Sequence, residues 1–261
     1  MVAVLLEGTH AQVEVKVLGR INPLGHGLVI SLERRAGLVH LVELAMGRGQ
    51  FAVCMPGRAG PGAEQGDRLA ITGHNGAGKS TLLRIMVGLL TPASGRVVAF
   101  GKECRQEVDF HDVRRRAGLV FQDADDQLFC PTVAEDIAFG PLNLGKSRDE
   151  ALAIVETVLA RLDLMRFRDR ITHKLSGGEK RLVTLAAVLA MEPDVLLLDE
   201  PTNALDEENE ARLTEILLSL PQAMIVVSHD PHFRMKIATR SLRLSEGRLA
   251  EPEPTCRHAV V

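Results

Sequence analysis

The strongest chemical signal in the sequence is a glycine-rich stretch that ends in a lysine and a serine. Residues 73–80 read Gly-His-Asn-Gly-Ala-Gly-Lys-Ser, which fits the phosphate-loop pattern G-x-x-x-x-G-K-[ST] at every fixed position. Glycines let backbone N–H groups turn inward around phosphate oxygens, and the following helix directs the positive end of its dipole at them. We expect Lys79 to reach the β- and γ-phosphates of a nucleotide and the Ser80 hydroxyl to bind Mg²⁺. The alternative is a glycine turn that only caps a helix, but the apolar strand before it and the helical pattern after it favour phosphate binding.

Two acids end an apolar strand further along the chain. Residues 195–198 are Val-Leu-Leu-Leu, and Asp199 and Glu200 follow directly. The carboxyl edge of a parallel sheet is where α/β proteins bind their ligands. We expect Asp199 to hold Mg²⁺, directly or through water, and Glu200 to orient or deprotonate an attacking water. Alone, this pattern is equally typical of a solvated acidic turn. Its occurrence together with the phosphate loop favours the functional interpretation.

Two further features could contact phosphate groups. Residues 175–179, Leu-Ser-Gly-Gly-Glu, precede a predicted helix, and a serine with two glycines makes a helix start suited to phosphate. One nucleotide needs a single phosphate loop, so this second start is either a plain helix cap or a contact to the γ-phosphate of a nucleotide on another subunit. His229 follows the apolar strand 224–227, which we expect beside the Asp199 strand. A lone histidine is more often structural, but this position favours a γ-phosphate contact.

The elements that must position these residues alternate between strands and helices. The strand segments are mostly apolar runs, as in a parallel sheet covered on both faces, and they are 68–72, 97–100, 118–121, 195–198 and 224–227. The helix segments have an apolar period or end near a proline, and they are 80–90, 150–164 and 179–191. In the second of these helices, Ala151, Val155, Val158 and Leu162 share one face. This alternation predicts an α/β fold.

Composition excludes several classes of protein. The chain has 261 residues, of which 46% are hydrophobic and 25% charged, so it is neither wholly disordered nor fibrous. The formal net charge of −3 provides no general basic field, and we expect no nucleic-acid partner. The cysteines are scattered without a Cys-x-x-Cys pair, which favours reduced thiols over a disulfide framework or a zinc site; they are Cys54, Cys104, Cys130 and Cys256. We find no signal-peptide pattern and no apolar run near the ~18–20 residues that cross a bilayer, so we expect any membrane link to come through a partner.

These motifs, in this order, resemble those of the ATP-binding-cassette (ABC) ATPases over roughly residues 66–250. The matching segments are 73–80 (Walker A), Gln122 (Q-loop), 175–179 (signature), 196–200 (Walker B), 204–206 (D-loop) and His229 (switch histidine). The resemblance implies ATP and Mg²⁺ as cofactors and ATP hydrolysis as the activity. It implies catalytic roles for Glu200, His229 and Gln122, and Mg²⁺ contacts for Ser80, Gln122 and Asp199. It assigns ATP binding to Gly73, His74, Asn75, Gly76, Ala77, Gly78, Lys79, Ser80 and Thr81. It assigns contacts to ATP on a second chain to Leu175, Ser176, Gly177, Gly178 and Glu179.

A narrower resemblance involves residues 121–129 and 132–143. These segments are similar to those of the ATPase subunits of energy-coupling-factor importers, the cobalt/nickel type above all. The resemblance implies integral membrane transporter subunits as partners, a second ABC ATPase chain in a homo- or heterodimer, and a peripheral place on the cytoplasmic face of the cell membrane. In that family this stretch faces the membrane subunit, and here it combines apolar side chains with acids: Leu128, Phe129, Ile137, Phe139, Asp125, Asp126, Glu135 and Asp136. Two alternatives remain open: a soluble non-transport ABC ATPase and a catalytically weak regulatory cassette.

The expected fold class is α/β, a P-loop ATP-binding cassette with a parallel-sheet core, a helical subdomain and an irregular N-terminal β segment. The expected divisions are 1–65 for that irregular segment, 66–250 for the cassette with its helical lobe at about 123–180, and 251–261 for a mobile tail. Relatives have strands and an adenine-stacking aromatic residue near the N-terminus, and Phe51 is the candidate here, with a core or linker role as the alternative. The Gly/Arg/Pro-rich stretch 47–62 departs from the family, as a wrong start or a shifted reading frame would make it do.

Overall fold

The computed structural model describes residues 66–92, 96–100 and 102–250, together with the backbone of three two-residue strands. Those strands are β1 (Val13–Glu14), β2 (Glu33–Arg34) and β3 (Cys54–Met55). The predictions for the rest of 1–65, for Phe51 and for the tail 251–261 lie outside the described residues.

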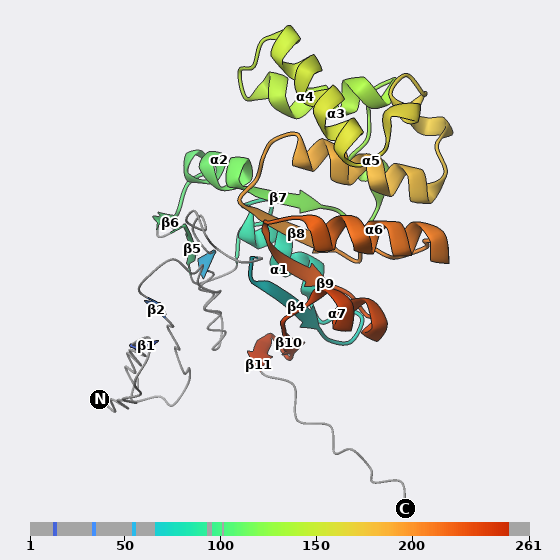
Figure 1. Cartoon of the computed structure of the whole chain (residues 1–261). Coiled ribbons are helices and arrows are strands. Elements are labelled where there is room, and N and C mark those ends of the chain that lie inside the picture. The colour runs from blue at the N-terminus through green and yellow to red at the C-terminus, as the bar shows by residue number, and fades with distance from the viewer. Residues whose placement is uncertain are drawn as a thin grey trace, which may run out of the picture.

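A six-stranded sheet forms the centre of the cassette (Figure 1). Its order is β11-β10-β4-β9-β8-β7, and every neighbouring pair is parallel except the terminal hairpin β10–β11. The strands are β4 (Arg68–Thr72), β7 (Ala117–Val120), β8 (Val195–Asp199), β9 (Ala223–Val227), β10 (Arg240–Ser245) and β11 (Arg248–Ala250). The parallel core is therefore confirmed, and the strands that carry the phosphate loop, Asp199 and His229 are β4, β8 and β9, with β9 in the middle.

Both faces of this sheet are buried, as the uninterrupted apolar runs predicted. Along β8, Leu196 and Leu198 belong to one hydrophobic cluster, while Val195 and Leu197 belong to another on the opposite face. The alternation follows from the period of two in a strand. The first cluster includes side chains of α5 (Gly177–Leu189) and α6 (Glu207–Ser219), and the second includes those of α1 (Lys79–Met86).

Helix α1 ends earlier than predicted. It stops at Met86 rather than Leu90, because Gly88 has a φ of +72°, which ends the helical turn, and a Cβ there would lie 2.3 Å from the Phe110 ring. Phe110 lies on α2 (Glu107–Arg116), which the sequence analysis did not predict. A second, small sheet has the strand order β3-β5-β6. Its last two strands are β5 (Val97–Ala99) and β6 (Lys102–Cys104).

A helical lobe interrupts the sheet between β7 and β8 (Figure 1). It contains α3 (Val133–Asn143), α4 (Arg148–Arg161), the beginning of α5 and the 3-10 turns η1 (Ala124–Asp126), η2 (Met165–Phe167) and η3 (Thr172–Lys174). Helix α4 begins two residues before the predicted start because Ser147 and Glu150 form a capping box. Its predicted apolar face is confirmed at Ala151, Val155 and Leu162, which are buried together with Leu159.

The last helix is α7 (Pro231–Ile237), which follows β9. Of the helices in the described ranges, none has the length and apolar character needed to cross a membrane. The two cysteines whose side chains are described, Cys104 and Cys130, are free thiols.

Candidate functional site

The phosphate loop joins β4 to α1 and owes its shape to three glycines. Gly73, Gly76 and Gly78 have φ values of +152°, +81° and +94°, in the region where a side chain is strained. A Cβ at Gly73 would lie 2.4 Å from the carbonyl oxygen of Leu244, so this glycine also lets β10 approach. At Gly76 and Gly78 no heavy atom lies within 4 Å of an added Cβ. At these two positions it is the positive φ, and not a close neighbour, that favours glycine.

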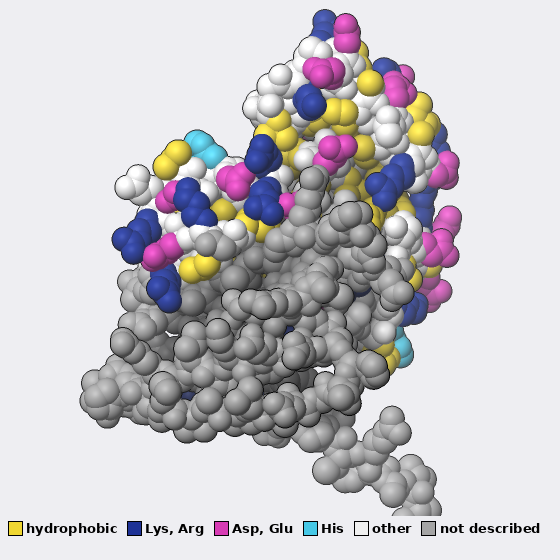
Figure 2. All heavy atoms as spheres, turned by 60° about the vertical axis from the view of Figure 1, so that its left-hand side comes forward, with side chains coloured by type: hydrophobic (Ala, Val, Ile, Leu, Met, Phe, Trp, Pro, Cys, Tyr) yellow, Lys and Arg dark blue, Asp and Glu magenta, His cyan; other side chains and the backbone are white. Residues whose placement is uncertain are grey.

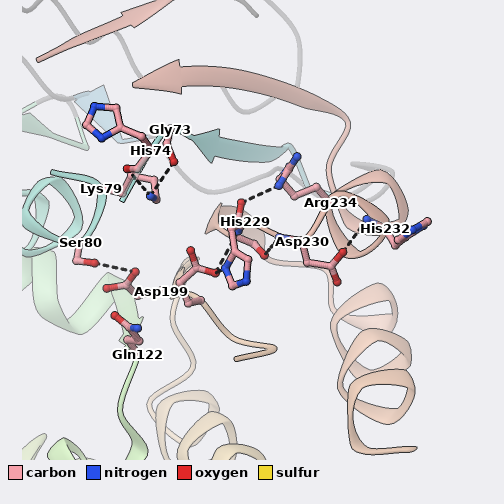
Figure 3. Close-up of polar contacts among 12 residues, drawn as sticks. Gly73, His74, Lys79, Ser80, Gln122, Asp199, His229, Asp230, His232 and Arg234 are labelled. Carbon is pink, nitrogen blue, oxygen red and sulfur yellow. Dashed lines mark hydrogen bonds and ion pairs between the residues drawn. The ribbon is translucent and has the colours of Figure 1, made fainter. Parts of the chain in front are cut away.

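Lys79 begins α1, and its side chain turns back into this loop (Figure 3). The Nζ atom donates to the carbonyl oxygens of Gly73 and His74, at 3.0 and 3.1 Å, and the residue is 8% exposed. The first N–H groups of a helix have no partner within the helix, and here they belong to the residues that follow Gly78. A cation and these N–H groups thus face the same small volume, which is the environment that phosphate oxygens prefer.

Ser80 and Asp199 bring two oxygen atoms together from parts of the chain that are 119 residues apart. The Ser80 hydroxyl donates to Asp199 Oδ1 at 3.1 Å, and Asp199 is 3% exposed. Burial raises the pKa of Asp199 above its ordinary value, and the Ser80 bond acts against that rise. A hydroxyl and a buried carboxylate side by side fit Mg²⁺, which takes oxygen ligands. When bound, Mg²⁺ would neutralise charge on the β- and γ-phosphates.

Gln122 follows β7, the neighbour of β8, and its side chain points toward Asp199 in Figure 3. The backbone carbonyl oxygen of Gln122 accepts a hydrogen bond from the Arg181 guanidinium. The structure thus brings Lys79, Ser80, Gln122 and Asp199 to one edge of the sheet, as the motifs predicted.

Glu200 and His229 form a direct pair beside this edge. Glu200 Oε2 accepts from the His229 backbone N–H at 3.1 Å and lies 2.8 Å from His229 Nδ1. Glu200 is 7% exposed and has a φ of +45°, a backbone conformation unusual for a residue with a side chain. Its own N–H donates to the carbonyl oxygen of Val227 at 2.8 Å, which continues the register of β8 with β9.

The turn that presents His229 is fixed by its own polar contacts. Arg234 on α7 donates to the carbonyl oxygen of Ser228 at 2.9 Å, and the Ser228 hydroxyl accepts from the Asp230 N–H at 3.1 Å. Asp230 in turn caps α7. Nothing in the local sequence distinguishes these three residues from those of an ordinary turn, so their role could not be predicted from it.

The signature residues differ in what they can offer to a ligand. Ser176 caps α5 through a capping box with Glu179, while the Leu175 side chain is buried in the core. A Cβ at Gly178 would lie 2.6 Å from Asn209 Nδ2 on α6, so that glycine is needed for packing. Ser176 and Gly177 are exposed, and a contact from Leu175 would have to come from its backbone. No hydrogen bond among the described residues joins this segment to Lys79 or Glu200.

The acids of the segment 121–143 have unequal roles. Asp136 is 5% exposed, so it is not one of the surface acids. Its carboxylate accepts from the Phe129 and Cys130 N–H groups, both at 2.9 Å, and from the Thr172 hydroxyl at 2.8 Å. The pKa of the Cys130 thiol rises to about 11, through burial first and the nearby Asp136 second. Asp136 therefore holds the loop before α3 in place, a role that the sequence pattern did not reveal.

Comparisons with known proteins agree with this geometry. The family described as ABC transporter matches residues 62–203. An ABC transporter ATP-binding protein from Brucella suis is 56% identical over 194 residues, which cover 74% of this chain and 80% of the relative. The cobalt import ATP-binding protein CbiO from Rhodobacter capsulatus is 50% identical over 189 residues, 71% of this chain and 68% of that protein. The energy-coupling factor transporter ATP-binding protein EcfA from Methanothermobacter thermautotrophicus is 44% identical over 196 residues, 73% of this chain and 63% of that protein.

Solved structures of ABC transporter subunits and ATP-binding cassettes have a fold similar to that of this chain. CbiO1 from Clostridium perfringens, described as part of the ABC transporter complex CbiONQ, has a TM-score of 0.66 and 32% identity, covering 82% of this chain and 87% of its own. A dimeric ATP-binding cassette in a post-hydrolysis state with ADP and Pi has a TM-score of 0.64 and 25% identity, covering 82% and 95%.

Proposed function

The chain belongs to the ABC transporter family as an ATP-hydrolysing, ATP-binding subunit, and from that premise we propose that it drives an energy-coupling-factor importer for cobalt or nickel ions or a vitamin. Relatives named for cobalt import and for an energy-coupling factor, at 50% and 44% identity, support this narrower assignment. The transported substrate would be bound by a partner, so cargo ligands are not required of this chain.

The observation that carries the proposal is an exposed aromatic pair on the helical lobe. Phe129 and Phe139 are 64% and 44% exposed, and their rings meet edge to face with centroids 4.7 Å apart. Leu142, Leu144 and Ile171 on the same lobe are also exposed. Figure 2 shows hydrophobic side chains between charged ones on the lobe at the top of the molecule. Large apolar side chains left in water in this way are typical of a protein interface.

This surface is physically connected to the nucleotide site. The segment that carries Phe129 begins at Gln122, and Asp136 holds Phe129 against α3. A membrane subunit that binds the aromatic pair would therefore contact the same short segment that places Gln122 beside Asp199. We assign Mg²⁺ binding to Ser80, Asp199 and Gln122, and we place the chain on the cytoplasmic face of the membrane through its partner.

A second ABC ATPase chain, identical or related, completes the proposed assembly. Ser176 and Gly177 are exposed at the start of α5, and no hydrogen bond among the described residues joins them to the phosphate loop. They are free to contact ATP on a second chain, as the resemblance implies. Catalysis would consist mainly of positioning and charge stabilisation by Lys79, Glu200 and His229.

Co-purification with any membrane subunits that the neighbouring reading frames encode tests the proposal. We expect the wild-type chain and those subunits to purify together in detergent, and a Phe129→Ser/Phe139→Ser variant to lose them while the isolated chain keeps its ATPase rate. Met235→Ser is the matched control, because Met235 is 72% exposed on α7, outside the aromatic surface.

The two alternatives predict different outcomes. Failure of the wild type to purify with any membrane subunit, with ATPase activity intact, would favour a soluble non-transport ATPase. A wild-type chain that binds ATP without turnover, alone and in the complex, would favour a regulatory cassette.

A further inference from the structure

Arg181 on α5 is a buried cation that no motif explains. It is 4% exposed, and its two terminal nitrogens donate separately to the carbonyl oxygens of Phe121 and Gln122. No ion pair joins its guanidinium to a carboxylate among the described residues. A buried guanidinium that bonds only to backbone carbonyls is costly to desolvate, so its position needs a reason.

The electrostatic surroundings of Arg181 point to the nucleotide site. Burial lowers its pKa, while the charges of Asp123 and Asp199 act in the opposite direction. Asp199 is the carboxylate beside Ser80. The guanidinium stays charged at neutral pH, because arginine is the most basic side chain in proteins.

Lys180, the residue before Arg181 on α5, also contacts the segment 121–125. Lys180 pairs with Asp125 at 2.6 Å, so consecutive cations on α5 contact residues 121–125. Asp125 is largely exposed, and such pairs contribute little energy. The two buried bonds of Arg181 therefore dominate the attachment of this segment to α5.

We propose that Arg181 is a positioning residue for ATP hydrolysis, which fixes the backbone at Phe121 and Gln122 so that the Gln122 side chain stays beside Asp199. Because α5 begins at the exposed signature residues, a shift of that helix would move Gln122 with it. The inference rests on the proposed function, in which Gln122 helps to bind Mg²⁺ for ATP hydrolysis.

The chain contains a matched arginine for comparison. Arg68 is 2% exposed, burial lowers its pKa, and its guanidinium donates to the carbonyl oxygens of Leu218 and Leu220, both at 3.1 Å. These carbonyls lie at the end of α6, where a cation is stabilising, and Arg68 begins β4 at the sheet edge opposite the phosphate loop. Arg68 thus has the burial and bonding pattern of Arg181 without contact to the site.

The test compares Arg181→Met, Arg181→Lys, Arg68→Met and Gln122→Ala in the full chain, by thermal unfolding and by steady-state ATPase kinetics at temperatures where each variant is folded. We expect Arg181→Met to lower kcat by about ten- to a hundredfold with KM for ATP within about threefold, since a misplaced group costs rate more than binding. Arg181→Lys keeps the charge but has one nitrogen for two carbonyls. Its kcat should therefore lie between those of Arg181→Met and the wild type. Arg68→Met should lower the melting temperature and leave kcat within about twofold.

A double-mutant cycle separates the inference from its premise. If Arg181 acts through Gln122, Arg181→Met/Gln122→Ala should be no slower than the slower single variant. Rate losses that multiply would overturn the proposal, as would an Arg181→Met variant that loses only stability, like Arg68→Met. If Gln122→Ala has a normal kcat while Arg181→Met is slow, Gln122 has no part in hydrolysis, and the premise of the proposal is wrong.

Discussion

Glu200 Oε2 lies 2.8 Å from His229 Nδ1 and also accepts the His229 backbone N–H. The two residues follow β8 and β9, which are adjacent parallel strands, so the sheet itself sets their distance. With Glu200 ionised, Nδ1 carries the hydrogen and donates it, which leaves Nε2 directed elsewhere. The other carboxylate oxygen has no hydrogen bond among the described residues and is available to a water molecule.

The first prediction separates two roles of His229. Asparagine can place its amide nitrogen close to the position of Nδ1, whereas alanine cannot. If His229 acts mainly by orienting Glu200, His229→Asn should keep clearly more activity than His229→Ala, and His229→Ala should lose about ten- to a hundredfold in kcat. Equal losses in both variants would assign the role to Nε2 and the γ-phosphate. ATP affinity, measured alongside, should change little in either variant.

The second prediction concerns the cost of burying Asp199. Because its pKa is raised in the folded protein, the folded state holds more protons than the unfolded state as pH rises through the interval between the two pKa values, and stability falls there. Asp199→Asn should therefore be more stable than the wild type at pH 7.5 in EDTA without nucleotide, with a smaller difference near pH 4. Denaturant unfolding at both pH values measures this. A variant less stable than the wild type at pH 7.5, with an unchanged m-value, contradicts the argument.

The Asp199→Asn substitution should also change the Mg²⁺ requirement of ATP hydrolysis. The variant should need a higher Mg²⁺ concentration for half-maximal ATP hydrolysis, because a neutral amide is a weaker ligand than a carboxylate. Ser80→Ala should shift the Mg²⁺ requirement in the same direction, since the Ser80 hydroxyl lies 3.1 Å from Asp199.

The third prediction follows from the burial of Asp136. Alanine there would leave the Phe129 and Cys130 N–H groups without their acceptor. We expect Asp136→Ala to lower the free energy of unfolding by about 2–4 kcal/mol. Asp126→Ala is the control, because Asp126 is exposed, and it should stay within about 0.5 kcal/mol of the wild type. An Asp136→Ala variant that also stays within about 0.5 kcal/mol of the wild type would mean that the contacts of Asp136 add no stability.

The sequence predicted the parts of this molecule in which chemistry and local pattern coincide. The phosphate loop, the β8 carboxylates and the position of His229 after β9 all depend on residues next to one another in the chain. Helix α4 was found from its apolar period, and its capping box at Ser147 and Glu150 could have set its first turn. Helix α1 ends early, before Gly88, whose φ of +72° ends the helical turn. A glycine just after a helix is a local stop signal, and it could have set this end as well.

The burial of two charged residues, Asp136 and Arg181, could not be predicted from the sequence. Asp136 and Arg181 have charged side chains, and charged residues are usually solvated, so their sequence positions gave no sign of burial. The partners of Asp136 lie 6, 7 and 36 residues away, and the backbone carbonyls that bind Arg181 lie 59 and 60 residues away. A residue pattern does not specify either set of partners. Only the folded arrangement of α3, α5 and the segment 121–130 shows what these two side chains do.

We propose that Glu200 is the base that activates water for ATP hydrolysis at this site. Glutamine keeps the shape of Glu200 and can still accept from His229, but it cannot take a proton. The most direct measurement is ATP affinity together with single-turnover hydrolysis in Glu200→Gln, with Lys79→Ala as the comparison. Glu200→Gln should bind ATP almost normally, hydrolyse it at least about a hundredfold more slowly and accumulate as an ATP-bound dimer, whereas Lys79→Ala should lose ATP affinity and dimerisation together. Near-normal turnover in Glu200→Gln would contradict the account and transfer the role of base away from this residue.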